Sequence, residues 1–307
     1  MTDSKLVSVL LPTYNAEKYI AEAIDSVIQQ EHKNVEIVIS DDASSDNTPA
    51  ILKEYQKKYP ELIKLFLQEK NLGVTNNCNF ILENCTGEFV CFFAGDDRLY
   101  QNCISDALPY FNDNNNLAIV FHKHDRIDGN SIVIEDVNIS DEMETHFGNI
   151  GSILEKGGYV GANGMLVKSS FLKHIKYNKE LATASDIDLI LQVLKGADTK
   201  FLYLAKTLSS WRYHEASITN SRTFECFKDV MYSNHKLMVD YPEYAKYALA
   251  RNRSIFYYFL LEKHMSKWKY DLYLEAFSDN IDQMSTRLLK RGYNFIWNFQ
   301  FFLLKKI

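Results

Sequence analysis

Hydrophobic residues in the first third of the chain follow two alternating patterns. Four short apolar runs, rich in β-branched and aromatic residues, are typical of buried strands: residues 5–11, 35–40, 62–67 and 88–94. Between these runs, apolar residues recur at helical spacing over residues 16–28, 48–59 and 74–84, with Asn15 and Thr48 expected as N-terminal caps. This alternation predicts an α/β fold whose parallel sheet is covered by helices on both faces.

The pattern changes after Gly95. Two further helices and two further strands are predicted, the helices over residues 101–111 and 186–195 and the strands over residues 117–122 and 201–204. Asp128-Gly129-Asn130, flanked by strand-like residues, is typical of a tight hairpin turn. Six of the twelve glycines lie between Gly148 and Gly164, which indicates a mobile loop.

The composition shifts again near Thr223. Residues 223–307 hold 20 of the 41 aromatic side chains but one proline and one glycine, which favours a helical region. We therefore expect two parts, residues 1–222 and residues 223–307. The final stretch, YNFIWNFQFFLL followed by two lysines, is too short to span a bilayer. We expect it to pack on the body, to form a homodimer contact or to lie on a membrane surface.

Charge and cysteine usage narrow the function classes. The chain has 34 Lys and Arg against 40 Asp and Glu, so its net charge is −6 and a nucleic-acid partner is not expected. The five cysteines are odd in number and form no C-x-x-C pair, which is typical of reduced thiols rather than of disulfides or structural zinc. Because no apolar stretch has the length of a signal or spanning segment, we expect a cytoplasmic protein.

Polar residues gather where the predicted strands end. Residues 12–15 follow the first strand, Asp41 and Asp42 follow the second, and Asp96 and Asp97 follow the fourth. Ligands of parallel sheets bind at this edge, and carboxylates gathered there indicate a divalent cation that in turn holds phosphates. The chain contains neither G-x-G-x-x-G nor G-x-x-x-x-G-K-[ST], which argues against a dehydrogenase and against a kinase with a phosphate-binding loop.

Taken in order, several segments resemble the inverting glycosyltransferases of family 2. These segments are VSVLLPTYNAEKYIAEAIDSVIQQ, VEIVISDDASSDNT, EKNLGVTNNCN, TGEFVCFFAGDD, ATASDIDLILQVL and SSWRYHEASIT. The resemblance covers roughly residues 5–220 and does not include the aromatic C-terminal region. It implies a GT-A fold, in which helices flank a mostly parallel nucleotide-binding sheet, and a nucleotide-diphosphate sugar as donor.

The resemblance also implies roles for individual residues on the donor side. The residues that would line the nucleotide pocket are Pro12, Thr13, Tyr14 and Asn15. Asp42 would accept a hydrogen bond from a uracil ring, which favours a UDP-sugar. Asp96 would reach the ribose or the metal, and Asp97 would ligate Mn²⁺ or Mg²⁺ bound to the diphosphate. Such a cation neutralises the charge that builds on the leaving nucleoside diphosphate.

On the acceptor side, an inverting transfer needs a general base, and Asp186 matches the base of the family. From the residues alone, Asp186 beside Ser185 fits the cap of an ordinary helix better than a base. Trp211-Arg212-Tyr213-His214 resembles the R-x-H stretch of the family. Arg212 is therefore expected at the diphosphate, and His214 at the metal or the diphosphate.

Two positions depart from the family pattern. Ala94 stands where the family often has a further aspartate, which leaves the number of protein ligands to the metal open. Cys78 stands before Asn79, where an arginine is common. A contact to the nucleotide is then missing unless Lys70 supplies it.

These observations predict a metal-dependent inverting glycosyltransferase that moves a sugar from a UDP-sugar to a hydroxyl of a saccharide or lipid-linked saccharide, as in the synthesis of bacterial surface polysaccharides. The glycine-rich stretch and the helix at Asp186 would border the acceptor. The alternative is a non-catalytic nucleotide-sugar-binding module of the same fold, against which the retained carboxylates argue. A nucleotidyltransferase would be expected to carry a basic glycine-rich loop after the first strand, where this chain has PTYN.

Overall fold

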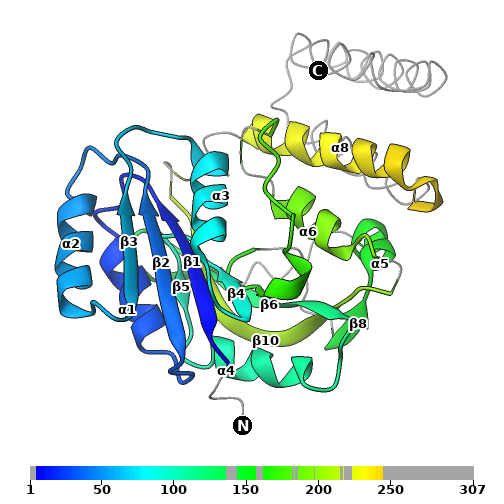
Figure 1. Ribbon diagram of the computed structural model, residues 1–307, viewed down its shortest axis with the longest axis horizontal. Helices are drawn as coiled ribbons and strands as arrows, with labels where there is room; N and C mark the ends of the chain where they lie inside the picture. Colours follow the sequence, from blue (N-terminus) through cyan, green and yellow to red (C-terminus); the bar gives the residue numbers. More distant parts are fainter. Residues whose placement is uncertain are drawn as a thin grey trace, which may run out of the picture. The chain divides into compact units, whose positions relative to one another are not determined.

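The computed structural model describes most of the chain up to residue 244, namely residues 5–135, 144–156, 162–181, 183, 186–196, 198–214, 217 and 223–244. The chain divides into two compact units, Met1–Arg251 and Asn252–Ile307, and all described residues belong to the first. This first unit is built on one mixed sheet with helices packed against it (Figure 1).

The strands of this sheet follow the order β3-β2-β1-β4-β9-β6-β10-β5, with β7 paired to β6 and β8 paired to β10. The strand bounds are β1 Val7–Thr13, β2 Val35–Asp41, β3 Ile63–Leu67, β4 Phe89–Phe92, β5 Arg98–Leu99, β6 Leu117–Ile127, β7 Val133–Glu135, β8 His146–Gly148, β9 Leu166–Lys168 and β10 Lys200–Arg212. The α-helices are α1 Ile20–Ile28, α2 Thr48–Lys58, α3 Val74–Asn84, α4 Cys103–Ala107, α5 Ile150–Lys156, α6 Asp186–Leu194 and α8 Thr223–Asp240. Three short 3₁₀ helices are η1 Leu108–Phe111, η2 Ser169–Phe171 and η3 Pro242–Tyr244.

The N-terminal half of the sheet confirms the predicted parallel arrangement. β1 pairs in parallel with β2 and β4, and β2 pairs in parallel with β3. β1 continues through Pro12 to Thr13, beyond the end expected from the proline. The Pro12 carbonyl accepts a hydrogen bond from Gly95 N–H, so the nitrogen of Pro12 also faces the side of β4. The pairing of β4 with β1 ends at Leu10, before Pro12 is reached. No ladder bond is lost there, which is why the strand tolerates the proline.

The second half of the sheet is mixed. β9 is antiparallel to β4 and β6, whereas β6 and β10 are parallel to each other. Both β6 and β10 extend well beyond the strands expected at 117–122 and 201–204. The extension of β6 over residues 123–127 reads KHDRI and has no run of apolar residues, but pairing with β10 supplies its backbone hydrogen bonds. The predicted hairpin at Asp128-Gly129-Asn130 is confirmed, since it joins β6 to β7.

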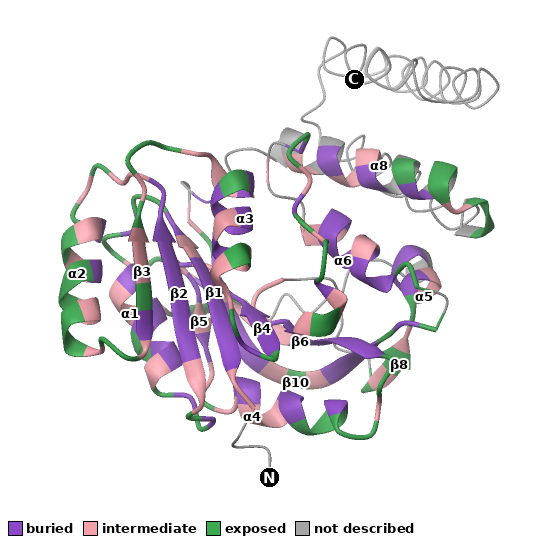
Figure 2. Cartoon of the chain, viewed as in Figure 1, coloured by how far each residue is buried: buried purple, intermediate pink, exposed green. Residues whose placement is uncertain are grey.

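Two buried hydrophobic clusters lie on the two faces of the sheet (Figure 2). One contains Val9 and Leu11 of β1 together with residues of α1 and α4. The other contains Leu10 of β1 together with residues of α3 and α6. Because successive strand residues point to opposite faces, this alternation places the sheet between the two clusters. The expected covering of both faces by helices is therefore confirmed.

Three local expectations are wrong. Thr48 is the first residue of α2 rather than its cap, since Asn47 occupies the N-cap position and Thr48 Oγ1 accepts from Ala16 N–H at 2.9 Å. Asn15 does not cap α1: its φ is +49°, its side-chain oxygen accepts from Ser45 N–H at 2.9 Å, and α1 begins at Ile20. The glycine-rich stretch 148–164 is not a continuous loop, because α5 occupies Ile150–Lys156 within it. Its residues 157–161 lie outside the described residues.

α8 confirms the helical prediction for the start of the C-terminal region, over Thr223–Asp240. Leu237 of α8 is buried in the same cluster as the apolar side of α6, so this helix is part of the first compact unit. A division at residue 222 stays a prediction, and the aromatic stretch from Tyr293 onward lies outside the described residues. Among the described helices, none combines the length and apolar character needed to cross a membrane.

Candidate active site

Hydrogen bonds draw the carboxyl ends of β1, β2 and β4 together. Asp42 N–H donates to the Thr13 carbonyl at 2.9 Å, and Gly95 N–H donates to the Pro12 carbonyl at 3.2 Å. Asn15 N–H donates to Ser44 Oγ at 2.8 Å. Residues 12–15, the end of β2 and the loop after β4 therefore form one edge, as the strand pattern predicted.

Asp42 ties a neighbouring loop to the end of β2. Its side chain is buried, and its two carboxylate oxygens accept from the backbone N–H groups of Leu72 at 2.6 Å and Gly73 at 3.0 Å. The side chain of Asn71 donates to the Asp42 carbonyl at 3.1 Å. Each carboxylate oxygen has two lone pairs, so Asp42 has the capacity to accept a further N–H donor from a ligand.

The Thr13 hydroxyl is the unsatisfied polar group of this edge. Thr13 is 5% exposed, and within the described structure its Oγ1 has no hydrogen-bond partner. Gly95 approaches it closely, since a Cβ at Gly95 would lie 3.0 Å from Thr13 Oγ1. The neighbouring Tyr14 side chain is 53% exposed. A buried hydroxyl without a partner needs an explanation, and a polar ligand bound at this edge would supply one.

The end of β10 meets the loop after β4 at a pair of carboxylates. Asp97 is buried, and its Oδ1 accepts from the backbone N–H of Arg212 at 2.8 Å. Asp96 is partly exposed, and its Oδ2 lies 2.9 Å from His214 Nε2. Burial, followed by the charge of Asp96, raises the pKa of Asp97 well above its ordinary value. Asp96, Asp97 and His214 are thus brought together as predicted.

These groups fit a divalent cation that shares its coordination with a ligand. No three His, Cys, Asp or Glu side chains of the described residues are already arranged as a metal site. A cation such as Mg²⁺ nevertheless needs only one or two carboxylates when phosphate oxygens and water complete its coordination. Burial and the charge of Asp96 raise the pKa of Asp97, and a cation bound nearby would oppose both effects by favouring the charged carboxylate. The donor set is thus compatible with Mg²⁺ or Mn²⁺ held jointly with a diphosphate.

The expectation for Arg212 as a ligand of the diphosphate does not agree with its surroundings. The side chain is 1% exposed and is surrounded by acceptors from the protein itself. Its Nε donates to the Asp96 carbonyl at 2.6 Å, and its Nη2 forms an ion pair with Glu22 Oε2 at 2.6 Å. A buried guanidinium must be paired in this way, and its donors are then not directed at a ligand.

On the other side of α3, Asp186 is the first residue of α6. Its side chain is partly buried, and its Oδ1 accepts from the hydroxyl of Tyr177 at 3.0 Å. Burial raises the pKa of Asp186 to about 6, and the hydrogen bond from Tyr177 opposes that rise. A carboxylate with this pKa is a stronger base than an ordinary aspartate yet is mostly ionised near neutral pH.

Cys78 of α3 connects the two sides. Burial raises the pKa of its thiol, and the charges of Asp186 and Asp42 raise it further. Asn79, the next residue, donates to the Tyr177 carbonyl at 2.9 Å and accepts from Tyr177 N–H at 2.8 Å. The segment that presents Asp186 is therefore braced against the helix that borders Asp42.

Two residues of this arrangement were not predicted from the sequence. Tyr177 carries no motif; its distance of nine residues from Asp186 is the only local signal. Glu22 lies on α1 among residues at helical spacing and reads as an ordinary surface carboxylate. Both are recognised only by their partners in the structure, which are Asp186 and Arg212.

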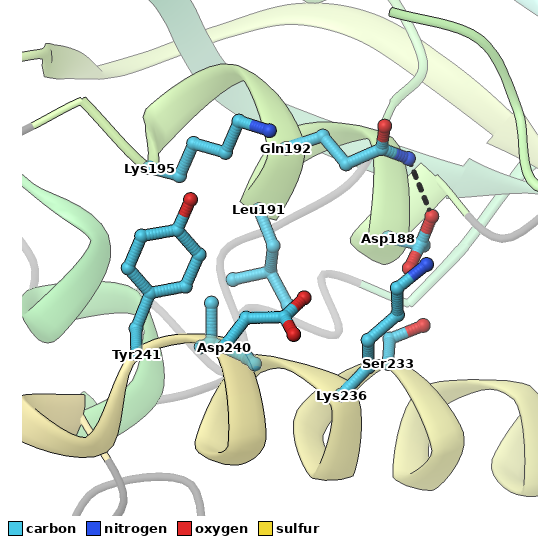
Figure 3. Close-up of a pocket in the computed structure, with 9 residues that line it drawn as sticks. Asp188, Leu191, Gln192, Lys195, Ser233, Lys236, Asp240 and Tyr241 are labelled. Atoms are coloured by element: carbon cyan, nitrogen blue, oxygen red, sulfur yellow. Dashed lines mark hydrogen bonds between the residues drawn. The ribbon is translucent and has the colours of Figure 1, made fainter.

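A separate pocket of about 110 Å³ lies between α6 and α8 (Figure 3). Asp188 lines it and accepts from Gln192 Nε2 at 2.6 Å, and the charged groups of Lys195, Lys236 and Asp240 surround it. None of the predicted site residues lines this pocket. Asp188 therefore belongs to the packing of α6 against α8 rather than to the acidic edge.

Comparison with known proteins agrees with this arrangement. The sequence profile of Glycosyl transferase family 2 matches residues 8–172, more than half of the chain. The chain is 29% identical over 226 residues to the GalNAc(5)-diNAcBac-PP-undecaprenol beta-1,3-glucosyltransferase of Campylobacter jejuni, an alignment that covers 69% of this chain and 67% of the relative.

Two solved structures share the fold. Residues 1–349 of TarS from S. aureus, in complex with UDP-GlcNAc, superpose with a TM-score of 0.72 at 20% identity, covering 90% of this chain and 80% of that TarS fragment. Mannosyltransferase PcManGT from Pyrobaculum calidifontis, in complex with GDP-Man and Mn²⁺, superposes with a TM-score of 0.59 at 15% identity, covering 94% and 79% of the two chains. The fold is therefore of the GT-A type, and by the profile match the chain is a glycosyltransferase that belongs to glycosyltransferase family 2.

Proposed function

We propose that this enzyme is a metal-dependent inverting glycosyltransferase that transfers a sugar from a UDP-sugar to a hydroxyl of a saccharide or lipid-linked saccharide. One observation carries the proposal: α3 links Asp42 to Asp186 through hydrogen bonds. Gly73, directly before α3, donates to Asp42 Oδ2 at 3.0 Å. Asn79 of α3 is hydrogen-bonded to the backbone of Tyr177, whose hydroxyl donates to Asp186 Oδ1 at 3.0 Å. The carboxylates that would bind the donor and the carboxylate that would accept the proton of the acceptor hydroxyl then border one site. A module that only bound a nucleotide sugar would have no use for the second group.

The donor end of this site is the edge formed by β1 and β2. Asp42 accepts the N–H of a uracil ring with the lone pairs that Leu72 and Gly73 do not use. The partnerless hydroxyl of Thr13 donates to the same nucleoside, and Pro12, Tyr14 and Asn15 border it. The complex of TarS with UDP-GlcNAc supports a uridine donor for a chain of this fold.

The diphosphate end is the loop after β4. Asp97 and Asp96 would hold Mn²⁺ or Mg²⁺ there, with His214 beside them. When bound, the cation neutralises the charge that develops on the departing nucleoside diphosphate. The Mn²⁺ in the complex of PcManGT supports a divalent cation for a chain of this fold.

The acceptor end is α6. Asp186 accepts the proton of the acceptor hydroxyl while that oxygen forms the new bond to the anomeric carbon and the bond from this carbon to the diphosphate breaks. Attack from the face opposite the diphosphate inverts the anomeric centre. Tyr177 donates to Asp186 Oδ1 and so fixes the direction of the carboxylate.

The acceptor class follows from the relatives rather than from the site. The name of the Campylobacter relative describes an undecaprenol-linked glycan as its acceptor, which supports a lipid-linked saccharide and a role in bacterial surface polysaccharide synthesis. Contact of the aromatic C-terminal tail with the inner membrane face, and a homodimer, remain part of the proposal. Both concern residues outside those that the structure describes.

Binding of UDP and of UDP-sugars, measured by thermal shift and calorimetry with and without Mn²⁺, tests the proposal. A ligand that binds the native state raises the unfolding temperature, and at a given concentration a tighter ligand raises it more. We expect UDP to stabilise the wild type with Mn²⁺ and Asp97→Asn to lose this metal-dependent part. Asp113→Asn, a change of the same kind at an exposed site, should behave as the wild type. Equal UDP affinity of Asp97→Asn and the wild type in Mn²⁺ would refute the metal role.

A further inference from the structure

Arg212 is the bulkiest of the fully buried side chains among the described residues. A guanidinium that is removed from water must be compensated by several acceptors, because an unpaired buried charge costs several kcal/mol. The identity of these acceptors therefore shows what the residue holds in place. They come from three segments that lie far apart in the sequence.

The first segment is the carboxylate pair itself. Arg212 Nε donates to the Asp96 carbonyl at 2.6 Å, and the backbone N–H of Arg212 donates to Asp97 Oδ1 at 2.8 Å. One residue thus fixes the backbone of Asp96 and the side chain of Asp97. Two residues further along the chain, His214 contacts the Asp96 carboxylate.

The other two segments anchor the guanidinium from behind. On α1, Glu22 Oε2 accepts from Nη2 at 2.6 Å, and the guanidinium lies 4.6 Å from the centre of the Tyr19 ring. On the turn before β7, the Asp128 carbonyl and Ser131 Oγ accept from Nη1 at 2.8 and 3.0 Å. The anchors also contact each other, since Ser131 Oγ donates to Glu22 Oε2 at 2.7 Å.

We infer that Arg212 is a positioning residue that holds Asp96 and Asp97 in the geometry needed to bind the divalent cation, with Glu22 as its anchor. This inference rests on the proposed function, because it presumes that the carboxylate pair takes a metal. It assigns Arg212 a role through the acidic loop and not through contact with the diphosphate. Lysine cannot replace it, since one ammonium group cannot serve acceptors in three directions as the planar guanidinium does.

The neighbouring strand offers a matched control. Arg126 of β6 is the register partner of Trp211, next to Arg212, and its guanidinium lies 3.9 Å from the ring centre of Tyr213. Arg126 stacks on the rings of Trp211 and Tyr213, the two residues on either side of Arg212. Because successive residues of a strand point to opposite faces, Arg126 lies on the face of the sheet opposite the side chain of Arg212. The same Arg-to-Lys change can thus be made with and without the link to the carboxylate pair.

The experiment measures the Mn²⁺ affinity in the presence of UDP, the UDP affinity with and without Mn²⁺, and the unfolding temperature, for the wild type, Arg212→Lys, Glu22→Gln and Arg126→Lys. We expect Arg212→Lys to weaken Mn²⁺ binding by about 10- to 100-fold, the usual effect of losing a group that orients metal ligands. Its affinity for UDP without metal should stay within about twofold of the wild type, since the guanidinium does not face the nucleotide. Arg126→Lys should match the wild type in both affinities.

Glu22→Gln keeps the hydrogen-bond acceptor but removes its charge, so it should show a smaller loss of Mn²⁺ affinity in a folded protein, even if Arg212→Lys does not fold. In the double variant, the loss in free energy of Mn²⁺ binding should be smaller than the sum of the losses in the two single variants, because both residues belong to one hydrogen-bond network.

Equal loss of UDP affinity with and without Mn²⁺ in Arg212→Lys would mean that Arg212 contacts the diphosphate directly, and unchanged Mn²⁺ affinity in Glu22→Gln would equally overturn the inference. If the wild type binds neither UDP nor Mn²⁺, the proposed function fails instead.

Discussion

The carboxylates on the two sides of α3 are held in different ways. On the donor side, Asp42 accepts from two backbone N–H groups and Asp97 accepts from one. On the acceptor side, Asp186 accepts from the hydroxyl of a single side chain, Tyr177, among the described residues. A backbone donor fixes the position of a carboxylate, because the main chain that carries it is itself held in the fold, whereas the hydroxyl of Tyr177 can rotate.

This difference matches the tasks proposed for the two regions. A group that binds a base or a cation must keep its position, and for Asp97, whose pKa is raised by burial, a bound cation would favour the charged form. A group that takes a proton must change its charge state within the working pH range, which the pKa of about 6 for Asp186 allows. Three substitutions probe the contrast, from the largest expected effect to the smallest.

Asp186→Asn should have the largest effect, because it removes the proton acceptor. We expect turnover to fall by about 10²-fold or more while the affinity for UDP with Mn²⁺ is unchanged. Since the folded-state pKa of Asp186 is raised, its ionisation opposes folding at neutral pH, and the neutral asparagine should not lower the unfolding temperature. Asp188→Asn, two residues along α6, is the matched control and should retain most of the turnover. Near-normal turnover of Asp186→Asn would exclude it as the base.

Asp42→Ala should have an intermediate effect, limited to the binding of the nucleoside part of the donor. Hydrogen bonds to a charged group contribute about 1.5–3 kcal/mol, so UDP affinity should fall by about tenfold or more. Affinity for a sugar phosphate that lacks uracil should change little. Asp41→Asn, at the neighbouring carboxylate that accepts from Ser44, serves as the comparison. Equal losses for both ligands would show that Asp42 acts only by holding the loop at Leu72 and Gly73.

Tyr177→Phe should have the smallest effect and should change the pH profile rather than the maximal rate. The hydrogen bond from Tyr177 lowers the pKa of Asp186, so its removal raises that pKa above about 6. The rate depends on the ionised carboxylate, which is lost as the pH falls through the pKa. The acid limb of turnover should therefore move to higher pH, with little change on the alkaline side of the profile. An acid limb that stays in place would separate Tyr177 from the base.

Much of the fold could be predicted from the sequence because its signals are local. Buried parallel strands appear as short apolar runs, and the residues that follow each run lie at one edge of the sheet. Residues 12–15, Asp42, Asp96 and Asp97 were placed correctly for this reason. Polar extensions such as that of β6 were missed, because the pairing that stabilises them comes from β10 and leaves no mark on the apolar pattern.

The amino-acid sequence by itself determined the parallel half of the sheet and the kinds of side chain at its edge, since both depend on neighbouring residues. Only the tertiary structure decided the burial and the hydrogen-bond partners of Arg212 and Asp186. Arg212 meets Asp97 across 115 positions of the chain and Glu22 across 190, and these partners convert an expected ligand of phosphate into an internal anchor. Burial beside Tyr177 likewise sets the pKa of Asp186. Solvent exposure and partners far away in the sequence determine the behaviour of both charged groups. The residues next to Arg212 and Asp186 in the sequence indicate neither the exposure nor the partners.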